Sequence, residues 1–569
     1  MRVEWHAPIE MDDGTVLRAD VYRPDDDGQY PVILNHGIYA KGLSFQDEIY
    51  QRQWHKLVSK DPSILEGSTN RFQTWEAVDP ERWVPHGYAV VRVDARGSGW
   101  SPGYLDPRSP REIQDFEQCI EWAGTQPWSN DKVGLCGISY YAVTQWLVAA
   151  LSPPHLAAMI PWEGYVDYYR GPTHHGGIRS EFQDNWWTRQ VTRVQYGVGE
   201  RALKNPNTGE SIAGPVTLTD QELEANRVDL AHELKSRQLD EQWYRDRSAD
   251  LPKITVPLLS AANWGGQGIH PTGNFEGFER TASPQKWLDV HGDTHYTHFY
   301  SQYGRDLQKR FFDHFLKGID NGWDQEPPVQ LNIRRPGERF ERRLEHEWPL
   351  ARTEWTRFYL DPDGLSLERQ PPEHQAVVAY RTMGDGLTFW LPALDEELEV
   401  TGPMAAKLFI SSDTTDADLF LVVRLFDPTG AEVTFEGAND PNTPIASGWL
   451  RASHRQLDPE RSLSYRPYHP HREKQPLVPG AVYELDVEIW PSCVVAPPGY
   501  RLALTVRGKD YEYEGELDEY GRSFYYATRG TGGMTHTDPS DRPPEIFDTT
   551  VRLHASPTEP SYLLLPIIP

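Results

Sequence analysis

The chain has 569 residues, which is more than one hydrophobic core usually supports, so we expect two or three domains. Its formal net charge of −28 argues against nucleic acid and anionic membrane surfaces as partners. It contains no run of about eighteen apolar residues, so we expect no membrane-spanning helix.

The first third of the chain alternates predicted strands with a helix. Two strands separated by Asp12-Asp13-Gly14 form a predicted hairpin, because that turn sequence favours a tight reversal. Two apolar runs of strand length follow, and then a segment with helical spacing of its apolar residues. These elements span residues 3–9 and 16–22 (hairpin), 31–34 and 88–93 (buried strands) and 111–123 (helix).

A strand, a sharp turn and a helix then follow one another directly. Val133 to Cys136 is apolar, Gly137-Ile138-Ser139 is the turn, and residues 142–151 form a predicted buried helix. This is the setting of a nucleophile elbow, in which a strained turn exposes a serine. G-x-S-x-G would place glycine at Tyr141, so by itself the match is partial, and an ordinary turn serine is the alternative. The flanking sequence favours Ser139 as a nucleophile.

The strand and helix alternation continues to about residue 324. Residues 157–160, 254–262 and 286–290 are predicted strands, and 307–316 is a closing helix that stops at Gly318. Such alternation predicts an α/β fold with a doubly wound, mostly parallel sheet, in which function lies at the carboxyl ends of the strands. Residues 170–250 are polar and break the pattern. We interpret them as a cap inserted over the site, with a helical segment at 219–239.

From about residue 325 the pattern becomes short alternating strands separated by Pro, Gly and Asp. This predicts an all-β domain, a sandwich or jelly roll. The predicted organisation is a hydrolase-type α/β domain at 1–169 and 251–324, a helical cap at 170–250, and a C-terminal jelly-roll domain at 325–569.

Several separated blocks resemble the cocaine esterase and X-Pro dipeptidyl-peptidase (CocE/NonD) family of α/β-hydrolases, which includes α-amino acid ester hydrolases. They are M-D-D-G-T-V-L-R-A-D-V-Y-R-P, D-A-R-G-S-G, G-I-S-Y-Y, T-G-P-M-A-A-K-L-F-I-S-S-D and V-E-I-W-P-S, in the family's order along nearly the whole chain. The resemblance implies a serine hydrolase that cleaves carboxylic esters or amides through an acyl-enzyme. It implies neither a cofactor nor a metal.

The resemblance also suggests site residues. H-G-D-T-H is similar to the family's G-P-W-S-H and places the catalytic base at His295, with His291 and His298 as competitors. I-Y-A-K is similar to P-Y-x-K, so the Tyr39 hydroxyl and the Tyr140 N–H are the expected oxyanion donors. A metal bound by His291, Asp293, His295 and His298 is the alternative, but no standard ligand motif completes it.

The acid of the triad departs from the family. In the segment that resembles the family's W-x-D, Trp264 is present but Gly266 stands at the acid position. Either the site is a dyad or another strand end supplies the carboxylate. We favour Glu163, because strand ends of a parallel sheet converge, and we expect one of its oxygens within about 3.2 Å of a His295 ring nitrogen. Candidate pocket walls are Trp162 and Trp264, with Tyr165, Trp186, Trp187 and Tyr296.

Two other functions stay open at this point. An X-Pro dipeptidyl aminopeptidase would need a carboxylate for the substrate ammonium. A catalytically inactive protein with a glycan-binding jelly roll would explain the missing acid. We expect a small-molecule ester or amide substrate, with homo-oligomers left open. The three cysteines suggest no disulfide framework, and no N-terminal signal sequence is evident, so we expect a cytoplasmic protein.

Overall fold

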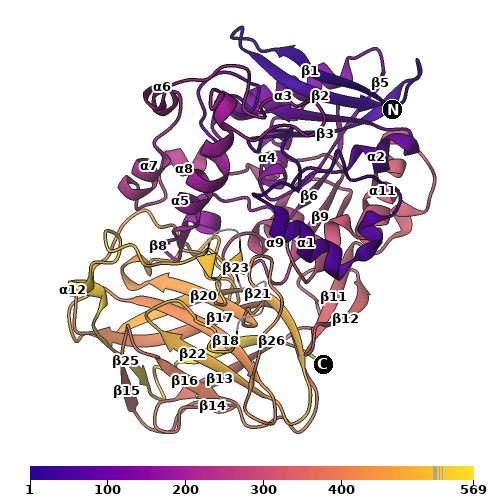
Figure 1. Ribbon diagram of the computed structural model, residues 1–569. Helices are drawn as coiled ribbons and strands as arrows, with labels where there is room; N and C mark the ends of the chain where they lie inside the picture. The colour runs from indigo at the N-terminus through magenta and orange to yellow at the C-terminus, as the bar shows by residue number, and fades with distance from the viewer. Residues whose placement is uncertain (517–521, 524–525, 528) are drawn as a thin grey trace.

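The computed structural model describes residues 1–516, 522–523, 526–527 and 529–569, and it divides into two bodies (Figure 1). The N-terminal body, indigo to pink, carries most of the helices. The C-terminal body, orange to yellow, is built of strands. None of the helices described has both the length and the apolar character that a bilayer span requires.

The N-terminal body is organised around a sheet of ten strands in the order β1-β2-β4-β3-β5-β6-β9-β10-β11-β12. The strands from β4 to β11 are parallel, and the β1–β2 hairpin and β12 add antiparallel edges. This confirms the predicted α/β fold. The strands are β1 Arg2–Glu10, β2 Val16–Arg23, β3 Tyr30–Gly37, β4 Ala89–Asp94, β5 Ser129–Ile138, β6 Leu156–Trp162, β9 Leu258–Asn263, β10 Lys286–His291, β11 Val329–Arg335 and β12 Arg339–Glu345.

The main helices of this body begin and end where local chemistry requires. The Ser109 hydroxyl accepts from the Glu112 N–H at the start of α3, and Gly318, with φ of 68°, ends α11 in the left-handed conformation that glycine tolerates. The helices are α1 Gln51–Lys60, α2 Pro80–Trp83, α3 Pro110–Gly124, α4 Tyr140–Ala149, α9 Pro271–Arg280, α10 Thr297–Tyr300 and α11 Gln302–Lys317.

The predicted boundary at residue 324 falls before two strands that still belong to the first sheet. β11 pairs parallel with β10, and β12 returns antiparallel along β11. The alternating residues of β11 resemble those of an all-β domain, but the available partner is the buried strand β10. The first body therefore extends to Glu345.

The inserted cap contains short helices rather than the one predicted across 219–239. The first of the two helices there has a capping box formed by Thr219 and Glu222, and the second starts anew because the Asp229 side chain accepts from the His232 N–H. The cap elements include β7 His174–His175, β8 Ile178–Arg179, α5 Phe182–Trp186, α6 Asp220–Ala225, α7 Leu230–Ser236 and α8 Gln242–Arg245.

The C-terminal body is an all-β barrel, as the sequence predicted. The sheet order runs β17-β21-β20-β18-β22-β16-β14-β13-β26, and a β17–β26 pairing closes the ring. Closure leaves no free edge within the ring. The strands are β13 Glu354–Asp361, β14 Ser366–Glu368, β15 Ala376–Arg381, β16 Leu387–Trp390, β17 Leu398–Ser412, β18 Asp418–Phe426, β19 Glu432–Val433, β20 Ala446–Arg451, β21 Tyr483–Ala496, β22 Arg501–Arg507, β25 Thr550–Ala555 and β26 Tyr562–Ile568, with a short helix α12 at Pro544–Phe547.

Candidate active site

The turn between β5 and α4 holds Ser139 in a strained conformation. Ser139 has φ of 56° and ψ of −111°, and its N–H donates to the Trp162 carbonyl at 3.0 Å. A side chain at Gly137 would place its Cβ 2.6 Å from the Tyr141 Cβ, so only glycine fits there. Backbone strain of this kind, at a half-buried serine between a strand and a helix, is typical of a nucleophile elbow.

Ser139 lies beside a histidine that the sequence analysis did not select. The Ser139 Oγ is 3.2 Å from Nε2 of His270, which immediately precedes α9 in the loop after β9. We expected His295 beside the nucleophile; the hydrogen-bond partner of Ser139 is His270 instead. His270 lies four residues beyond Gly266, in the segment where the resemblance implies a carboxylate, so nothing in the sequence pattern there indicates a base.

Glu163 is the carboxylate shared by the histidines of the site. Its Oε2 is 2.9 Å from Nδ1 of His295, so the expected contact between these residues is present. The same Oε2 lies 3.8 Å from Nδ1 of His270, and Oε1 is 3.0 Å from Nε2 of His291. Glu163 follows β6 with φ of 52° and is fully buried. The strand ends have thus converged as expected.

His295 is held by a second carboxylate. Its Nε2 is 2.9 Å from Oε1 of Glu76, a buried residue with φ of 61° that we did not predict as part of the site. The ring of His295 stacks on that of His270, with centroids 5.1 Å apart and planes within 10°. Glu76 precedes α2 in a loop far from any strand pattern, and nothing in its spacing marks it.

The two stacked histidines carry different charges. Burial disfavours the imidazolium of His295, but the carboxylates of Glu163 and Glu76 stabilise it by more than burial costs. The pKa of His295 is therefore raised to about 10. Burial, with the positive charge of His295, lowers the pKa of His270 to about 3. Burial alone would raise the pKa of Glu163, but His295 and His291 lower it to about 2. At neutral pH, His270 is therefore neutral and His295 is charged.

The two residues expected to donate to an oxyanion, Tyr39 and Tyr140, both line the Ser139 cavity. The Tyr39 hydroxyl accepts from the Trp186 indole N–H at 2.9 Å, so its own proton stays available to donate. Tyr140 is the first residue of α4, where backbone N–H groups have no partner within the helix. Both are the expected donors.

Ser139 opens into a cavity walled by all three parts of the chain. The lining residues are Tyr39, Glu76, Arg108, Ser139, Tyr140, Tyr165, Phe182, Gln183, Trp186, Gln190, Ile269, His270, His295 and Asn439. Phe182, Gln183, Trp186 and Gln190 come from the inserted segment 170–250, and Asn439 comes from the barrel.

Of the six predicted pocket walls, Tyr165 and Trp186 line the Ser139 cavity, whereas Trp162, Trp187, Trp264 and Tyr296 do not. The two main candidates show why. Trp162 packs behind the site against His291, with ring centroids 5.0 Å apart. Trp264 packs against Phe275 and Trp348 and donates its indole N–H to the Asn332 carbonyl. Both are fully buried, and neither lines the Ser139 cavity. Each side chain points from its strand end into the core, as most aromatic residues do.

Among the residues that the structure describes, two groups of side chains could hold a metal ion. Glu163, His270 and His295 offer atoms within 4.8 Å of one another, as do Asp289, His291 and His298. The quartet weighed from the sequence is not one cluster, because Asp293 instead pairs with Lys60 at 2.7 Å. The atoms of the first group already engage one another or Ser139, which fits an acid–base role better than a vacant ligand set.

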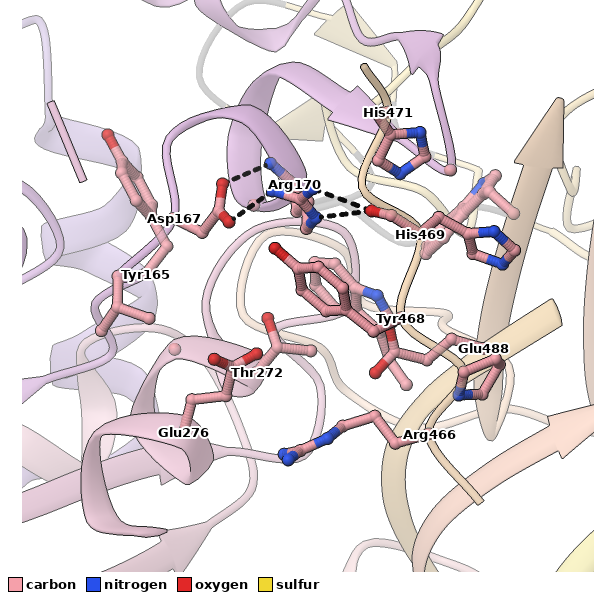
Figure 2. Close-up of a pocket in the computed structure, with 17 residues that line it drawn as sticks. Tyr165, Asp167, Arg170, Thr272, Glu276, Arg466, Tyr468, His469, His471 and Glu488 are labelled. Carbon is pink, nitrogen blue, oxygen red and sulfur yellow. Dashed lines mark hydrogen bonds and ion pairs between the residues drawn. The ribbon is translucent and has the colours of Figure 1, made fainter. Parts of the chain in front are cut away.

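A second cavity lies between α9 and the barrel (Figure 2). Thr272 and Glu276 of α9 face Arg466, Tyr468 and Glu488 across it. Arg170 joins the two sides, since its guanidinium donates to Asp167 at 2.8 Å and to the His469 carbonyl at 2.8 Å. Tyr165 lines both cavities.

Comparisons with known proteins identify the family of this chain. Residues 13–297 match the X-Pro dipeptidyl-peptidase (S15) family, and residues 321–564 match the X-Pro dipeptidyl-peptidase C-terminal non-catalytic domain. Cocaine esterase from Rhodococcus sp. (strain MB1 Bresler) is 24% identical over 98% of this chain and 97% of its own.

Solved structures give the same picture. A CocE/NonD family hydrolase from Staphylococcus aureus is 32% identical, with a TM-score of 0.84 over 100% of this chain and 94% of its own. An α-amino acid ester hydrolase shares the fold, with 16% identity and a TM-score of 0.67 over 100% of this chain and 96% of its own. The strained serine, the histidine beside it and these matches together place the chain in the X-Pro dipeptidyl-peptidase (S15) family, as a serine hydrolase.

Proposed function

We propose that this serine hydrolase cleaves small carboxylic esters, with Ser139 as nucleophile, His270 as general base and Glu163 as the acid behind it. The observation that supports this most is the 3.2 Å hydrogen bond between Ser139 Oγ and His270 Nε2. A base must lie within hydrogen-bond reach of the proton it takes, and His270 does so in the resting enzyme.

The charge states favour His270 over His295 as the base. A base needs a free nitrogen lone pair, and the imidazolium of His295, with its pKa raised to about 10, has none at neutral pH. His270 is neutral, and a proton on its Nδ1 faces the Glu163 carboxylate 3.8 Å away. That tautomer leaves Nε2 to accept from Ser139. The weak basicity of His270 slows proton transfer, and the nearby negative charge of Glu163 stabilises the imidazolium that forms.

The reaction follows from these positions. Ser139 Oγ attacks the ester carbonyl as His270 takes its proton, and the Tyr39 hydroxyl and Tyr140 N–H donate to the developing oxyanion. The tetrahedral intermediate collapses as His270 returns the proton to the leaving alkoxide. Water then attacks the acyl-enzyme as His270 takes a proton from it. His270 returns that proton to the Ser139 oxygen as the acid is released.

The cavity supports esters better than X-Pro peptides. An aminopeptidase needs a carboxylate for the α-ammonium of its substrate. Glu76 lines the cavity but is held at 2.9 Å by His295, and Glu163 is likewise bonded to His295 and His291. Neither carboxylate is therefore free to bind a substrate ammonium.

A cytoplasmic location is supported by Cys119, Cys136 and Cys493, all buried and free as expected in a reducing compartment.

The test is a panel of neutral esters, amides and X-Pro anilides, assayed with the wild type and Ser139→Ala. We expect turnover of esters, and we expect Ser139→Ala to lose it while thermal unfolding stays cooperative and near the wild-type temperature. Substantial ester turnover by folded Ser139→Ala would refute the mechanism. Preference for X-Pro anilides would refute the substrate class while leaving the nucleophile in place.

A further inference from the structure

Arg108 is a buried cation in the wall of the Ser139 cavity. It is 1% exposed, lies in the loop before α3, and has φ of 60°, which a non-glycine residue adopts only when its surroundings hold it there. Its guanidinium lies among aromatic rings, 4.3 Å from the Tyr168 centroid and 5.0 Å from that of Trp186. The site thus contains a fixed positive charge that ester hydrolysis itself does not use.

The hydrogen bonds of this guanidinium are incomplete. It donates from Nη1 to the Tyr165 hydroxyl at 3.0 Å, and from Nη2 to the Tyr168 hydroxyl at 2.8 Å and to Gln183 Oε1 at 3.3 Å. Its buried Nε has no hydrogen-bond partner among the described residues. An arginine has five N–H groups, so the Nε N–H and one Nη1 N–H have no acceptor among the described residues, and the side chain lines the Ser139 cavity.

No carboxylate in the described part of the chain forms an ion pair with Arg108, whose three side-chain hydrogen bonds all go to neutral groups. Asp106, two residues before Arg108, is paired instead with Arg247 at 2.9 Å. Glu112, four residues after Arg108, is the other acid close to it along the chain. Its oxygens accept from the Tyr140 hydroxyl and from the backbone N–H of Arg108, and burial raises its pKa to about 7. Burying an unpaired charge is costly, which is why buried charges usually have partners.

A neighbouring hydroxyl completes an anion site. Tyr165 accepts from Arg108 and also lines the cavity, so its own proton can point toward a bound anion. Arg108 also contacts the parts that handle the oxyanion. Its Cζ is 5.5 Å from the ring centroid of Tyr140, and Trp186, on which it stacks, donates to Tyr39. Arg108 and Ser139 line the same cavity, so an anion bound by Arg108 would share that cavity with the nucleophile.

We infer that the natural substrate of this hydrolase is an ester that also carries a carboxylate, which Arg108 and the Tyr165 hydroxyl bind while Ser139 attacks the ester carbonyl. This rests on the proposed ester hydrolysis. It makes the substrate anionic although the protein is acidic overall, with a net charge of −28. A guanidinium in a desolvated cavity is suited to a carboxylate, because the interaction is stronger there than in water.

The experiment uses two pairs of esters, and in each pair one member carries a carboxylate where the other carries a neutral group of similar size. One pair places the charge on the acyl side: 4-nitrophenyl hexanoate and the mono-4-nitrophenyl ester of hexanedioic acid. The other places it on the leaving group: methyl 4-acetoxybenzoate and 4-acetoxybenzoate. At constant ionic strength, we expect the wild type to favour the anionic member of one pair by about 10- to 100-fold in kcat/KM, the range for a charge-assisted hydrogen bond.

Variants assign that preference to the residue. Arg108→Gln should reduce the ratio of anionic to neutral kcat/KM to about 1, Arg108→Lys should retain part of it, and Tyr165→Phe should lower it several-fold. The matched control is Arg193→Gln, which removes a half-exposed cap arginine paired with Glu48 and should keep the wild-type ratio.

Three outcomes would overturn the inference: no preference for either anion in the wild type, a preference that Arg108→Gln retains, or the same loss in Arg193→Gln. If Arg108→Gln does not fold, the wild type alone decides. Hexanoate should then inhibit at least about tenfold more strongly than hexanamide, and equal inhibition would count against the site. If the wild type hydrolysed none of the neutral esters through Ser139, that result would instead refute the proposed function.

Discussion

Two histidines of this site share one carboxylate and yet differ in charge. Glu163 and Glu76 both bond to His295, whereas His270 faces Glu163 only from 3.8 Å and stacks on a cation. The carboxylates therefore stabilise the charged form of His295, and the resulting cation stabilises the neutral form of His270. The position of a histidine along the chain does not reveal its charge state, so the sequence alone could not distinguish His270 from His295 as the base.

This arrangement predicts an unusual pH profile. The pKa of His270 is lowered to about 3, so its neutral form is present at any pH well above that value. kcat/KM for a neutral ester should therefore stay level from about pH 5 to pH 8, without the fall near pH 6.5 that an unperturbed histidine base gives. Steady-state kinetics in buffers of constant ionic strength would measure it.

The competing assignment has the opposite signature. If His295 were the base, its raised pKa of about 10 would leave few molecules active at neutral pH. kcat/KM would then rise about tenfold per pH unit toward pH 10. A profile of that kind would contradict the role proposed for His270.

Tyr39 offers a second test at the residue scale. Tyr39→Phe should lower kcat by about 10²- to 10³-fold with little change in KM, because the lost donor acts on charge that develops only in the transition state. Tyr88→Phe is the control, since Tyr88 is a buried tyrosine whose hydroxyl donates to Asp313 at 2.7 Å, away from the Ser139 cavity. A rise in KM with unchanged kcat would make Tyr39 a substrate contact instead.

Most elements near the site could be predicted from the sequence. The strands β3 to β6 and the turn before α4 follow from apolar runs and small residues. That local pattern made Ser139 a candidate, and the flanking sequence was needed to choose it. Glu163 could also be found, because it directly follows a strand. His270 could not, because its position depends on how the loop after β9 folds before α9 starts.

The start of α9 is what places His270. The helix packs so closely on the loop after β6 that a Cβ at Gly273 would lie 2.4 Å from the Cα of Tyr165 and 2.5 Å from the Gly164 carbonyl oxygen. Gly273→Ala should therefore push the first turn of α9 away, at a cost of about 1–3 kcal/mol in unfolding free energy, and should lower kcat as well. Denaturant unfolding and ester kinetics would measure both.

A comparison within the same helix gives the control. Thr272 precedes Gly273 and faces the second cavity, so Thr272→Ala should have a smaller effect on kcat. Wild-type stability and kcat in Gly273→Ala would show that α9 can move without disturbing His270.

At the scale of the molecule, the site depends on three separate parts. The cap supplies Trp186, the barrel supplies Asn439, and the first sheet supplies Ser139. A hydrophobic cluster around Trp264 joins β9, β10 and β11 to β21 of the barrel, which explains why that indole faces the domain contact and not the substrate. Local pattern predicted both fold classes.

Long-range pairing was harder to predict. β11 and β12 carry alternating residues that fit either body. They join the first sheet because β11 pairs with the edge of β10 that β9 leaves unpaired, and β12 then pairs with β11. The contact of Arg108 with Tyr165 and Tyr168 likewise connects residues about sixty positions apart, through a loop and a strand end. Neither follows from spacing along the chain.

The rate at which a fluorophosphonate modifies Ser139 tests the central claim most directly, because it reports activation of the nucleophile without needing the natural substrate. Mass spectrometry would follow labelling of the wild type, His270→Gln and His295→Gln at pH 7. We predict that His270→Gln lowers the second-order rate constant by about 10²- to 10⁴-fold and that His295→Gln lowers it by less than about tenfold. Unchanged labelling in His270→Gln, with the large loss in His295→Gln, would contradict the account.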